Sequence, residues 1–225
     1  MKYIKTYEQK NNKSATEKLI DLLLYDIELD FKENSDKDVW SSSTAIYKKI
    51  PIKKVQKLLN EGADINAHDK RNNYGSILNM ATYRHHLDLV EFLIDNGADI
   101  NSCNSSKATS LYVASAHNNK EIVEYLIKKG ADINLPNDAG VLPIHVAIYR
   151  KSSEIAIILL KSGSMLTSSN GENLNRCMRN NKDYNFQKAL CELRPEEILK
   201  VDIEKINKRI LDEYSYIFSS NKYNI

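Results

Sequence analysis

The sequence predicts an all-α fold in which short helix pairs repeat and stack as a solenoid. A five-residue phrase occurs at Gly62 to Asn66, at Gly97 to Asn101 and at Gly130 to Asn134, and an altered copy begins at Gly163. The intervals between the glycines are 97 − 62 = 35, 130 − 97 = 33 and 163 − 130 = 33 residues. A period near 33 residues is typical of stacked repeats and not of one globular core.

Each phrase follows an apolar stripe with helical spacing, so its glycine is expected to end a helix. Glycine can adopt the left-handed conformation that satisfies the last carbonyls of a helix. The aspartate of each phrase is expected to shape the turn that follows. The stripes must be buried against neighbouring helices, and they consist of Leu89, Val90, Leu93 and Ile94; Ile122, Val123, Leu126 and Ile127; and Ile155, Ala156, Leu159 and Leu160.

A shorter helix is expected before each of these apolar helices. Ser76 and Thr109 are suited to cap the first two short helices, and Pro143 suits the first turn of the third. An alanine follows in each, at Ala81, Ala114 and Ala147, and allows the helices to approach closely.

From about Ser76 to Gly163 these residues resemble the ankyrin repeat, whose pattern runs Thr-Pro-Leu-His, Ala-Ala, Ile-Val, Leu-Leu and Gly-Ala-Asp. Leu142 replaces the capping threonine, only the last unit keeps both Pro143 and His145, and two extra residues lie around Arg71 to Tyr74. The resemblance implies an ankyrin-repeat solenoid of about five units. It also implies that His145 ties neighbouring backbone together by hydrogen bonds.

The predicted domains are an N-terminal helical cap over 1–38, repeats over 39–192 and a C-terminal helical cap over 193–225. In the N-terminal cap a helix is expected from Ser14 to about Phe31, with Ser14 or Thr16 as its cap and Glu17 in its first turn. It is expected to cover the end of the stack, because a terminal repeat otherwise exposes core surface, although such a helix could also dock a partner.

The first and last repeats are expected to be degenerate. The first keeps Ile46, Val55, Leu58, Leu59 and Gly62, whereas the last keeps Gly171, Leu174, Cys177, Phe186, Ala189 and Leu190. One further helix is expected from Pro195, with an apolar face of Leu199, Ile203, Ile206, Ile210 and Leu211.

Composition favours a cytoplasmic monomer without membrane contact. The three cysteines, Cys103, Cys177 and Cys191, are an odd number without paired spacing, which indicates a reducing compartment and not a disulfide framework. No apolar run approaches the length of a membrane span, and the first residues carry no secretory apolar core. The cytoplasm would be that of a host cell if the protein is an effector.

The sequence predicts no enzyme, cofactor or metal site. His85 and His86 are adjacent, so on a helix they point in different directions and cannot share a metal; they are expected in the turn between two helices. No residue that would orient His117 as the base for Cys103 can be identified. Every glycine is needed for a turn, which leaves no phosphate-binding loop.

The ankyrin resemblance implies that a partner binds a concave side, made by hairpin tips and by exposed residues of the first helices. The equivalent helix positions form a cationic and aromatic ladder of Lys48, Lys49, Tyr83, Arg84, Ala116, His117, Tyr149 and Arg150, with Arg179 as a continuation. The hairpin tips add Asn72, Asn73, Ser105, Ser106, Asp138 and Ala139. An alternative is that these residues only solvate the face.

The predicted function is a non-enzymatic scaffold or adaptor whose ladder binds an acidic or phosphorylated protein segment. A first alternative is a host-directed effector or ubiquitin-ligase adaptor of an intracellular bacterium or large virus, since Leu193 to Leu199 is similar to the opening of an F-box. A second is a nucleic-acid binder, which the net charge of +2 does not favour and which steep salt dependence would reveal.

Overall fold

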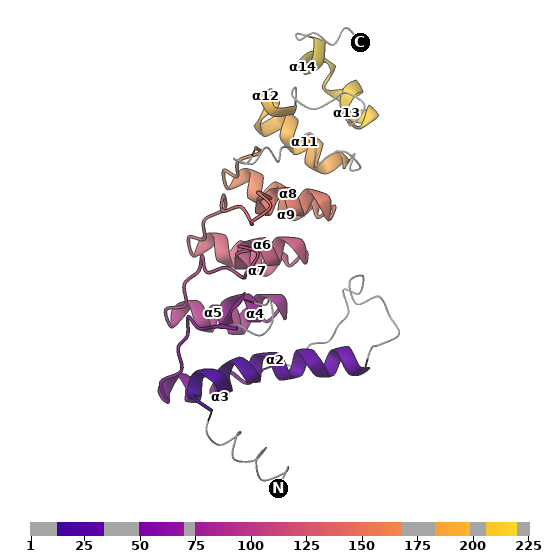
Figure 1. Ribbon diagram of the computed structural model, residues 1–225. Coiled ribbons are helices and arrows are strands. Elements are labelled where there is room, and N and C mark those ends of the chain that lie inside the picture. Colours follow the sequence, from indigo (N-terminus) through magenta and orange to yellow (C-terminus); the bar gives the residue numbers. More distant parts are fainter. Residues whose placement is uncertain (1–12, 34–49, 70–74, 168–182, 199–205, 220–225) are drawn as a thin grey trace. The chain divides into compact units, whose positions relative to one another are not determined.

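A computed structural model describes residues 13–33, 50–69, 75–167, 183–198 and 206–219 of the chain (Figure 1). The chain divides into two compact units, Met1–Ser105 and Ser106–Ile225, which are called the N-terminal unit and the C-terminal unit. Most of the described elements in both units are short helices that pack in pairs.

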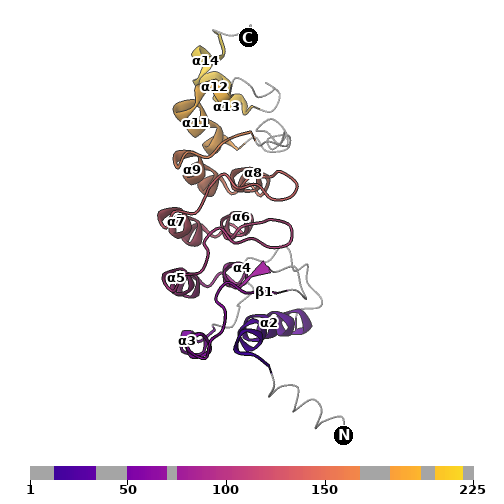
Figure 2. The same ribbon diagram turned by 60° about the vertical axis from the view of Figure 1, so that its left-hand side comes forward.

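The N-terminal unit contains two stacked helix pairs. The first pair is α2 (Ala15–Glu33) with α3 (Ile52–Asn60), and the second is α4 (Ile77–Tyr83) with α5 (Leu87–Asp95). Figure 2 shows α2 next to α4 in one row and α3 next to α5 in another; we call the first row inner and the second outer. A hairpin precedes α4, in which β1 (His68–Asp69) pairs antiparallel with β2 (Gly75–Ser76).

Helix α2 confirms the helix predicted from Ser14. Ser14 Oγ accepts a hydrogen bond from the Glu17 main-chain N–H at 3.2 Å, and Glu17 Oε2 accepts one from the Ser14 N–H at 2.8 Å, which is a capping box. Leu19 and Leu23 are fully buried where α2 packs on the repeat helices. The helix therefore covers α4 as the inner member of the first pair, whereas Ile46, expected in the first repeat, lies outside the described residues.

The C-terminal unit continues the same pairing. Its pairs are α6 (Ser110–Ala116) with α7 (Lys120–Lys128) and α8 (Pro143–Tyr149) with α9 (Ser153–Lys161), and α6 packs on α8 as α7 packs on α9. Helix α11 (Tyr184–Leu193) packs on α9. The last helices are α12 (Pro195–Ile198), α13 (Lys208–Glu213) and α14 (Ser215–Ser219).

The predicted helix stops and caps are confirmed. The four repeat glycines have φ between +88° and +92°, and Ala98 N–H donates to Leu93 O at 3.0 Å to close the turn after α5. Ser76 Oγ accepts from Asn79 N–H at 3.2 Å, and Thr109 Oγ1 accepts from Tyr112 N–H at 3.3 Å. In the apolar stripes, Leu93, Leu126 and Leu159 are fully inaccessible to solvent, whereas Ile94 and Ile127 are half-buried.

The repeated aspartates shape their turns as predicted, and the repeated asparagines link consecutive repeats. Each aspartate Oδ1 accepts from the N–H of the asparagine two residues later, at 2.9 to 3.0 Å, in Asp64–Asn66, Asp99–Asn101 and Asp132–Asn134. Asn66 Oδ1 then accepts from Asp99 N–H at 2.7 Å, and Asn134 Oδ1 accepts from Met165 N–H at 2.8 Å. The phrase therefore fixes the spacing of neighbouring repeats within each unit.

His145 has the role that the ankyrin resemblance implies. Its side chain is fully buried, Nδ1 accepts from Leu142 N–H at 3.3 Å, and Nε2 lies 3.1 Å from Leu166 O. Because Nδ1 accepts, Nε2 carries the hydrogen and donates it to Leu166 O. This neutral imidazole ties the start of α8 to the segment that follows α9.

The C-terminal region differs from the single helix predicted from Pro195. Helix α12 is described over Pro195–Ile198, and a separate helix, α13, starts after Asn207, whose backbone is extended (φ −64°, ψ 131°). Asn207 Oδ1 accepts from Arg209 N–H at 3.0 Å, so this residue caps a new helix. Of the predicted apolar face, Ile206 and Ile210 are buried and Leu211 is half-buried, whereas Leu199 and Ile203 lie outside the described residues. Phe186, Ala189 and Leu190 are buried in α11, which confirms the second helix predicted in the last repeat.

The turns between paired helices contain residues with left-handed backbone that are not glycine. Lys151 has φ +59° and Asn118 has φ +56°. We expect Lys151→Gly to raise the free energy of unfolding by about 0.5–1 kcal/mol, because the strain of a side chain at positive φ exceeds the entropy cost of glycine. Asn118→Gly is the control and should change the free energy of unfolding by less, because asparagine tolerates this conformation. Urea unfolding measures both, and a destabilised Lys151→Gly variant would contradict the prediction.

Candidate functional site

Two exposed basic residues of the C-terminal unit, Arg150 and Lys151, directly follow α8. Helices α6 and α8, the first helices of their pairs, are called the inner helices of this unit. Helices α6 and α8 pack side by side and have seven residues each, and the residues after them are 150 − 117 = 33 positions apart. His117 and Arg150 therefore occupy equivalent positions at the same end of neighbouring helices. We define the basic edge as His117, Asn118, Tyr149, Arg150 and Lys151.

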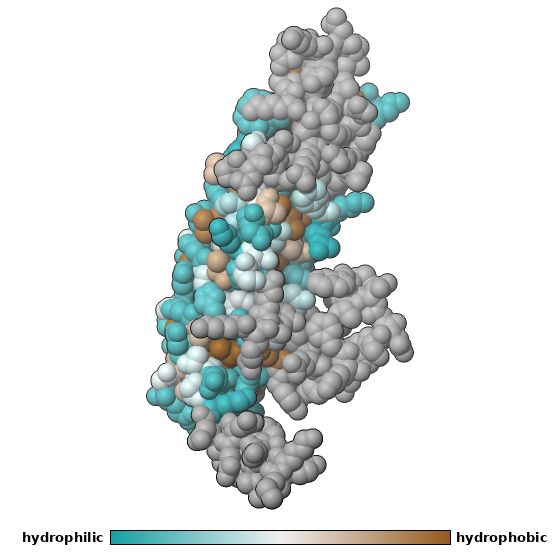
Figure 3. All heavy atoms as spheres, viewed as in Figure 1, coloured by the Kyte–Doolittle hydropathy of each residue, from teal (hydrophilic) through white to brown (hydrophobic). Residues whose placement is uncertain are grey.

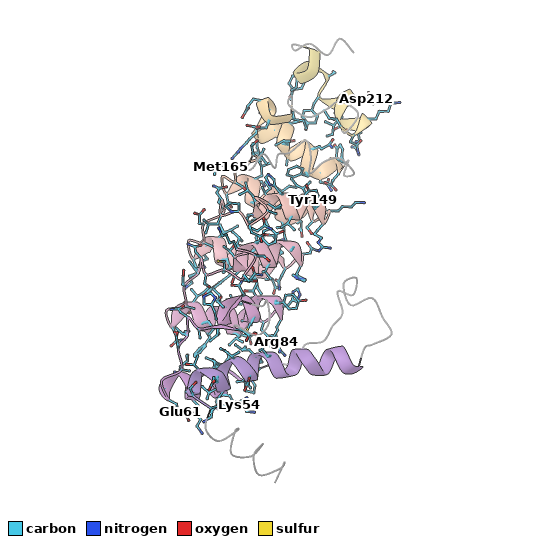
Figure 4. The ribbon with its side chains drawn as sticks, in the orientation of Figure 1. Lys54, Glu61, Arg84, Tyr149, Met165 and Asp212 are labelled. Atoms are coloured by element: carbon cyan, nitrogen blue, oxygen red, sulfur yellow. The ribbon has the colours of Figure 1, made fainter. Side chains whose placement is uncertain are left out.

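Tyr149 gives the basic edge an aromatic surface. Its side chain is 43% exposed at the end of α8, where Figure 4 labels it. Arg150 and Lys151 are exposed, as is Asn118, and His117 is half-buried. Aromatic and cationic side chains, the two kinds predicted for the ladder, therefore reach solvent together at the end of α8.

The main chain of this turn is already hydrogen-bonded. The N–H groups of Arg150, Lys151 and Ser152 donate to Val146 O, Ile148 O and Ala147 O, at 2.9, 3.0 and 2.9 Å. An αR–αL pair can present N–H groups to an anion, but here they satisfy the end of α8. An anion at this edge would therefore be recognised by side chains.

The acidic residue that follows the turn is paired elsewhere. Glu154 Oε1 accepts from Lys120 Nζ at 3.1 Å, and this contact with Glu154 raises the pKa of Lys120. Within the part of the chain that the structure describes, Arg150 and Lys151 form no ion pair. Their charges are therefore available to an incoming anion.

The structure separates the predicted hairpin-tip residues from the basic edge. Asp138 and Ser106 precede the inner helices, whereas Arg150 and His117 follow them, and a helix of seven residues spans about 10 Å. In Figure 4, Met165, at the start of the next turn, and Tyr149 lie on opposite sides of the α8 and α9 pair. The tips also bond to each other, since Asp138 N–H donates to Ser106 O at 2.9 Å.

The expectation that Arg84 is exposed is wrong. Only 1% of its side chain is exposed, and Nη1 donates to Leu23 O in α2 at 2.8 Å (Figure 4). The physical reason is the length of α2, which has 19 residues where the other inner helices have seven. Its additional turns cover Arg84. The length of the apolar pattern from Leu19 to Phe31 was the signal in the sequence that could have shown this.

The remaining predicted site residues have mixed environments. Tyr83 is half-buried, and burial raises the pKa of its hydroxyl. Ser105 is exposed, and so is Ala139 at the tip that holds Asp138. Ala116 is half-buried at the end of α6. Outside the described residues lie Lys48, Lys49, Asn72, Asn73 and Arg179.

The residues considered for catalysis have structural surroundings. His85 lies in the turn between α4 and α5 with φ +57°, and burial together with the neighbouring His86 lowers its pKa. Burial raises the pKa of the Cys191 thiol to about 11, so it is protonated at neutral pH. In the described ranges, no three His, Cys, Asp or Glu side chains gather so that they could hold a metal ion. Nor does any helix in those ranges have the length and apolar character needed to cross a bilayer.

The described surface is mainly hydrophilic in the view of Figure 3, where brown residues form small separate areas. The large apolar side chains that are exposed among the described residues are Tyr149, Met165, Leu193 and Tyr216. Only Tyr149 of these belongs to an inner helix.

Comparison with known families agrees with this geometry. The family model described as ankyrin repeats, in three copies, matches residues 43–137 and 78–170, which together cover more than half of the chain. The chain belongs to the ankyrin-repeat family. No curated protein matches it. Ankyrin repeats generally act as protein–protein interaction modules and are typically not enzymes. Membership of this family therefore implies that the chain binds a protein partner.

Proposed function

We propose that this ankyrin-repeat protein is a scaffold or adaptor that binds an acidic or phosphorylated protein segment at its basic edge. The observation that supports this most is the exposed Tyr149 beside two cations, Arg150 and Lys151, that form no ion pair within the described residues. The neighbouring Glu154 does not neutralise them, because it pairs with Lys120.

The three side chains supply different contacts to such a segment. Arg150 can donate two parallel hydrogen bonds to one carboxylate or phosphate, which fixes the orientation of that group. Lys151 acts as a point charge on a flexible stem. Tyr149 offers a flat apolar surface, and Tyr and Arg are the residue types that contribute most to binding energy in protein interfaces.

The proposal narrows the ladder predicted from the sequence. Arg84 is covered by α2 and is not part of the proposed surface. The hairpin tips lie at the other end of the inner helices and are also left out. Roles as a host-directed effector, as a ubiquitin-ligase adaptor or in the cytoplasm stay predictions.

A displayed library of random peptides, selected on the full-length protein, tests this function. We expect the selected peptides to be enriched in Asp and Glu, and the triple variant Tyr149→Ser, Arg150→Ser, Lys151→Asn to bind them at least about tenfold more weakly. Asparagine is chosen at position 151 because it tolerates positive φ.

The control variant, Lys107→Asn with Lys128→Ser, also removes two exposed cations, and Lys107 has φ +56°. It should bind like the unmodified protein. Peptides without acidic enrichment, or equal losses in both variants, would contradict the proposal. Stronger binding to a DNA duplex than to any peptide, lost steeply with added salt, would favour nucleic acid instead.

A further inference from the structure

The basic edge presents its donors in two groups at a spacing that the fold sets. The first group is His117 with Asn118 after α6, and the second is Tyr149, the last residue of α8, with Arg150 and Lys151 after it. Because α6 and α8 are packed neighbours, their axes lie roughly 8–10 Å apart. A segment that crosses both helix ends therefore meets two groups of hydrogen-bond donors at about that separation.

This spacing matches one extended conformation better than the other regular ones. A polyproline II chain has three residues per turn and rises about 3.1 Å per residue, so residues i and i+3 share a face about 9 Å apart. In a β-strand, residues on the same face are two or four positions apart, at about 7 or 13 Å. One turn of an α-helix rises only about 5.4 Å.

The exposed side chains also favour an extended segment over a helix. A helical partner binds by placing an apolar face in a hydrophobic groove. Among the described residues, Tyr149 is the one large apolar side chain exposed on an inner helix, and the exposed Arg150 and Lys151 follow it in the chain. This surface offers little for an apolar helix face to bury, whereas it can donate hydrogen bonds to two separate anions.

Resting on the proposed function, we infer that the partner segment is polyproline II-like and carries two anionic side chains three residues apart. One anion contacts Arg150 and Lys151, and the other contacts the imidazole of His117 and the amide of Asn118. Two residues between the anions, preferably proline, hold the spacing and pass over Tyr149. Proline suits this contact because its ring is apolar and its φ already matches the conformation.

Three synthetic peptides of equal length and charge test the spacing. They contain phosphoserine pairs separated by one, two or three prolines in identical flanks, and a peptide with one phosphoserine is the reference. With the full-length protein, we expect the pair separated by two prolines to bind about tenfold more tightly than either neighbour, because only it reaches both groups.

A variant separates the two groups of donors. His117→Ala with Asn118→Gly should lower binding of the best peptide about tenfold and bring the three double peptides to equal affinity, because only one group of donors then remains. An unchanged urea unfolding midpoint shows that the variant is folded, and binding of the single-phosphoserine peptide shows that Arg150 and Lys151 are still accessible.

The outcomes distinguish this inference from the proposed function. If the three double peptides bind equally tightly, or if the variant weakens all peptides alike, the spacing inference is wrong and the acidic-segment function stands. If no phosphopeptide or acidic peptide binds, both fail.

Discussion

Replacing Leu126 by Ala should lower the free energy of unfolding by about 2–5 kcal/mol, as truncation of a buried leucine does. Leu126 lies in α7, is fully buried and belongs to the stripe that repeats every 33 residues. Its removal leaves a cavity between helices that pack only on their neighbours, so the stability of the adjacent pairs should fall as well. Urea unfolding measures the change.

The control for Leu126→Ala is Lys128→Ala, which changes an exposed residue two positions later in the same helix. A surface substitution of this kind should stay within about 0.5 kcal/mol of the unmodified protein. Equal unfolding midpoints for the Leu126 variant and the unmodified protein would contradict the packing described for α7.

Replacing Gly75 by Ala should cost about 2–4 kcal/mol for two separate reasons. Gly75 has φ +79°, which L side chains rarely adopt, and its added Cβ would lie 2.5 Å from Asn104 Cα and 2.6 Å from Asn104 Cβ. Both distances are shorter than van der Waals contact, so the backbone must shift.

Gly97→Ala is the matched control for Gly75→Ala, because an alanine at position 97 has the same conformational strain but no close neighbouring atom. Gly97 has φ +92°, and an added Cβ would meet nothing within 4 Å. The free energy of unfolding of Gly97→Ala should fall by only about 1–2 kcal/mol. Equal losses in the two variants, measured by urea unfolding, would show that the approach of Asn104 to Gly75 is not energetically important.

The sequence was most informative where one residue type serves one local purpose. The repeat glycines end helices, and Asp64, Asp99 and Asp132 bond the N–H two residues later, as predicted. These effects depend on a few neighbouring residues, so they can be derived without knowledge of the packing. The bonds from Asn66 and Asn134 to the next repeat were not predicted, because they join residues about 31 to 33 positions apart.

Prediction was less successful where the result depends on distant segments. The burial of Arg84 could not be derived from its own repeat, because α2, some 60 residues earlier in the chain, covers this side chain. In the same way, the break before α13 depends on Asn207, whose main chain N–H donates to Gln187 Oε1 in α11 at 2.7 Å. Both contacts require the packing of segments that are remote in sequence.

The sequence predicted which kinds of side chain the candidate site contains, but it did not predict how they are arranged in space. Tyr149 and Arg150 are exposed as the repeat alignment required, and Lys151, which was not among the predicted residues, adds a second cation. The signal for Lys151 was its position in the turn, where a left-handed residue must project outward. The separation of hairpin tips from helix ends follows only from the direction of the inner helices.

The most direct test of the account is to map where the peptide with two phosphoserines separated by two prolines binds. Amide chemical shifts of the isotope-labelled, full-length protein would be recorded by NMR during a titration with that peptide. We expect the largest changes at residues 116–119 and 149–152. Changes concentrated at the hairpin tips, at 105–107 and 137–140, would contradict it and move the binding surface to the opposite end of the inner helices.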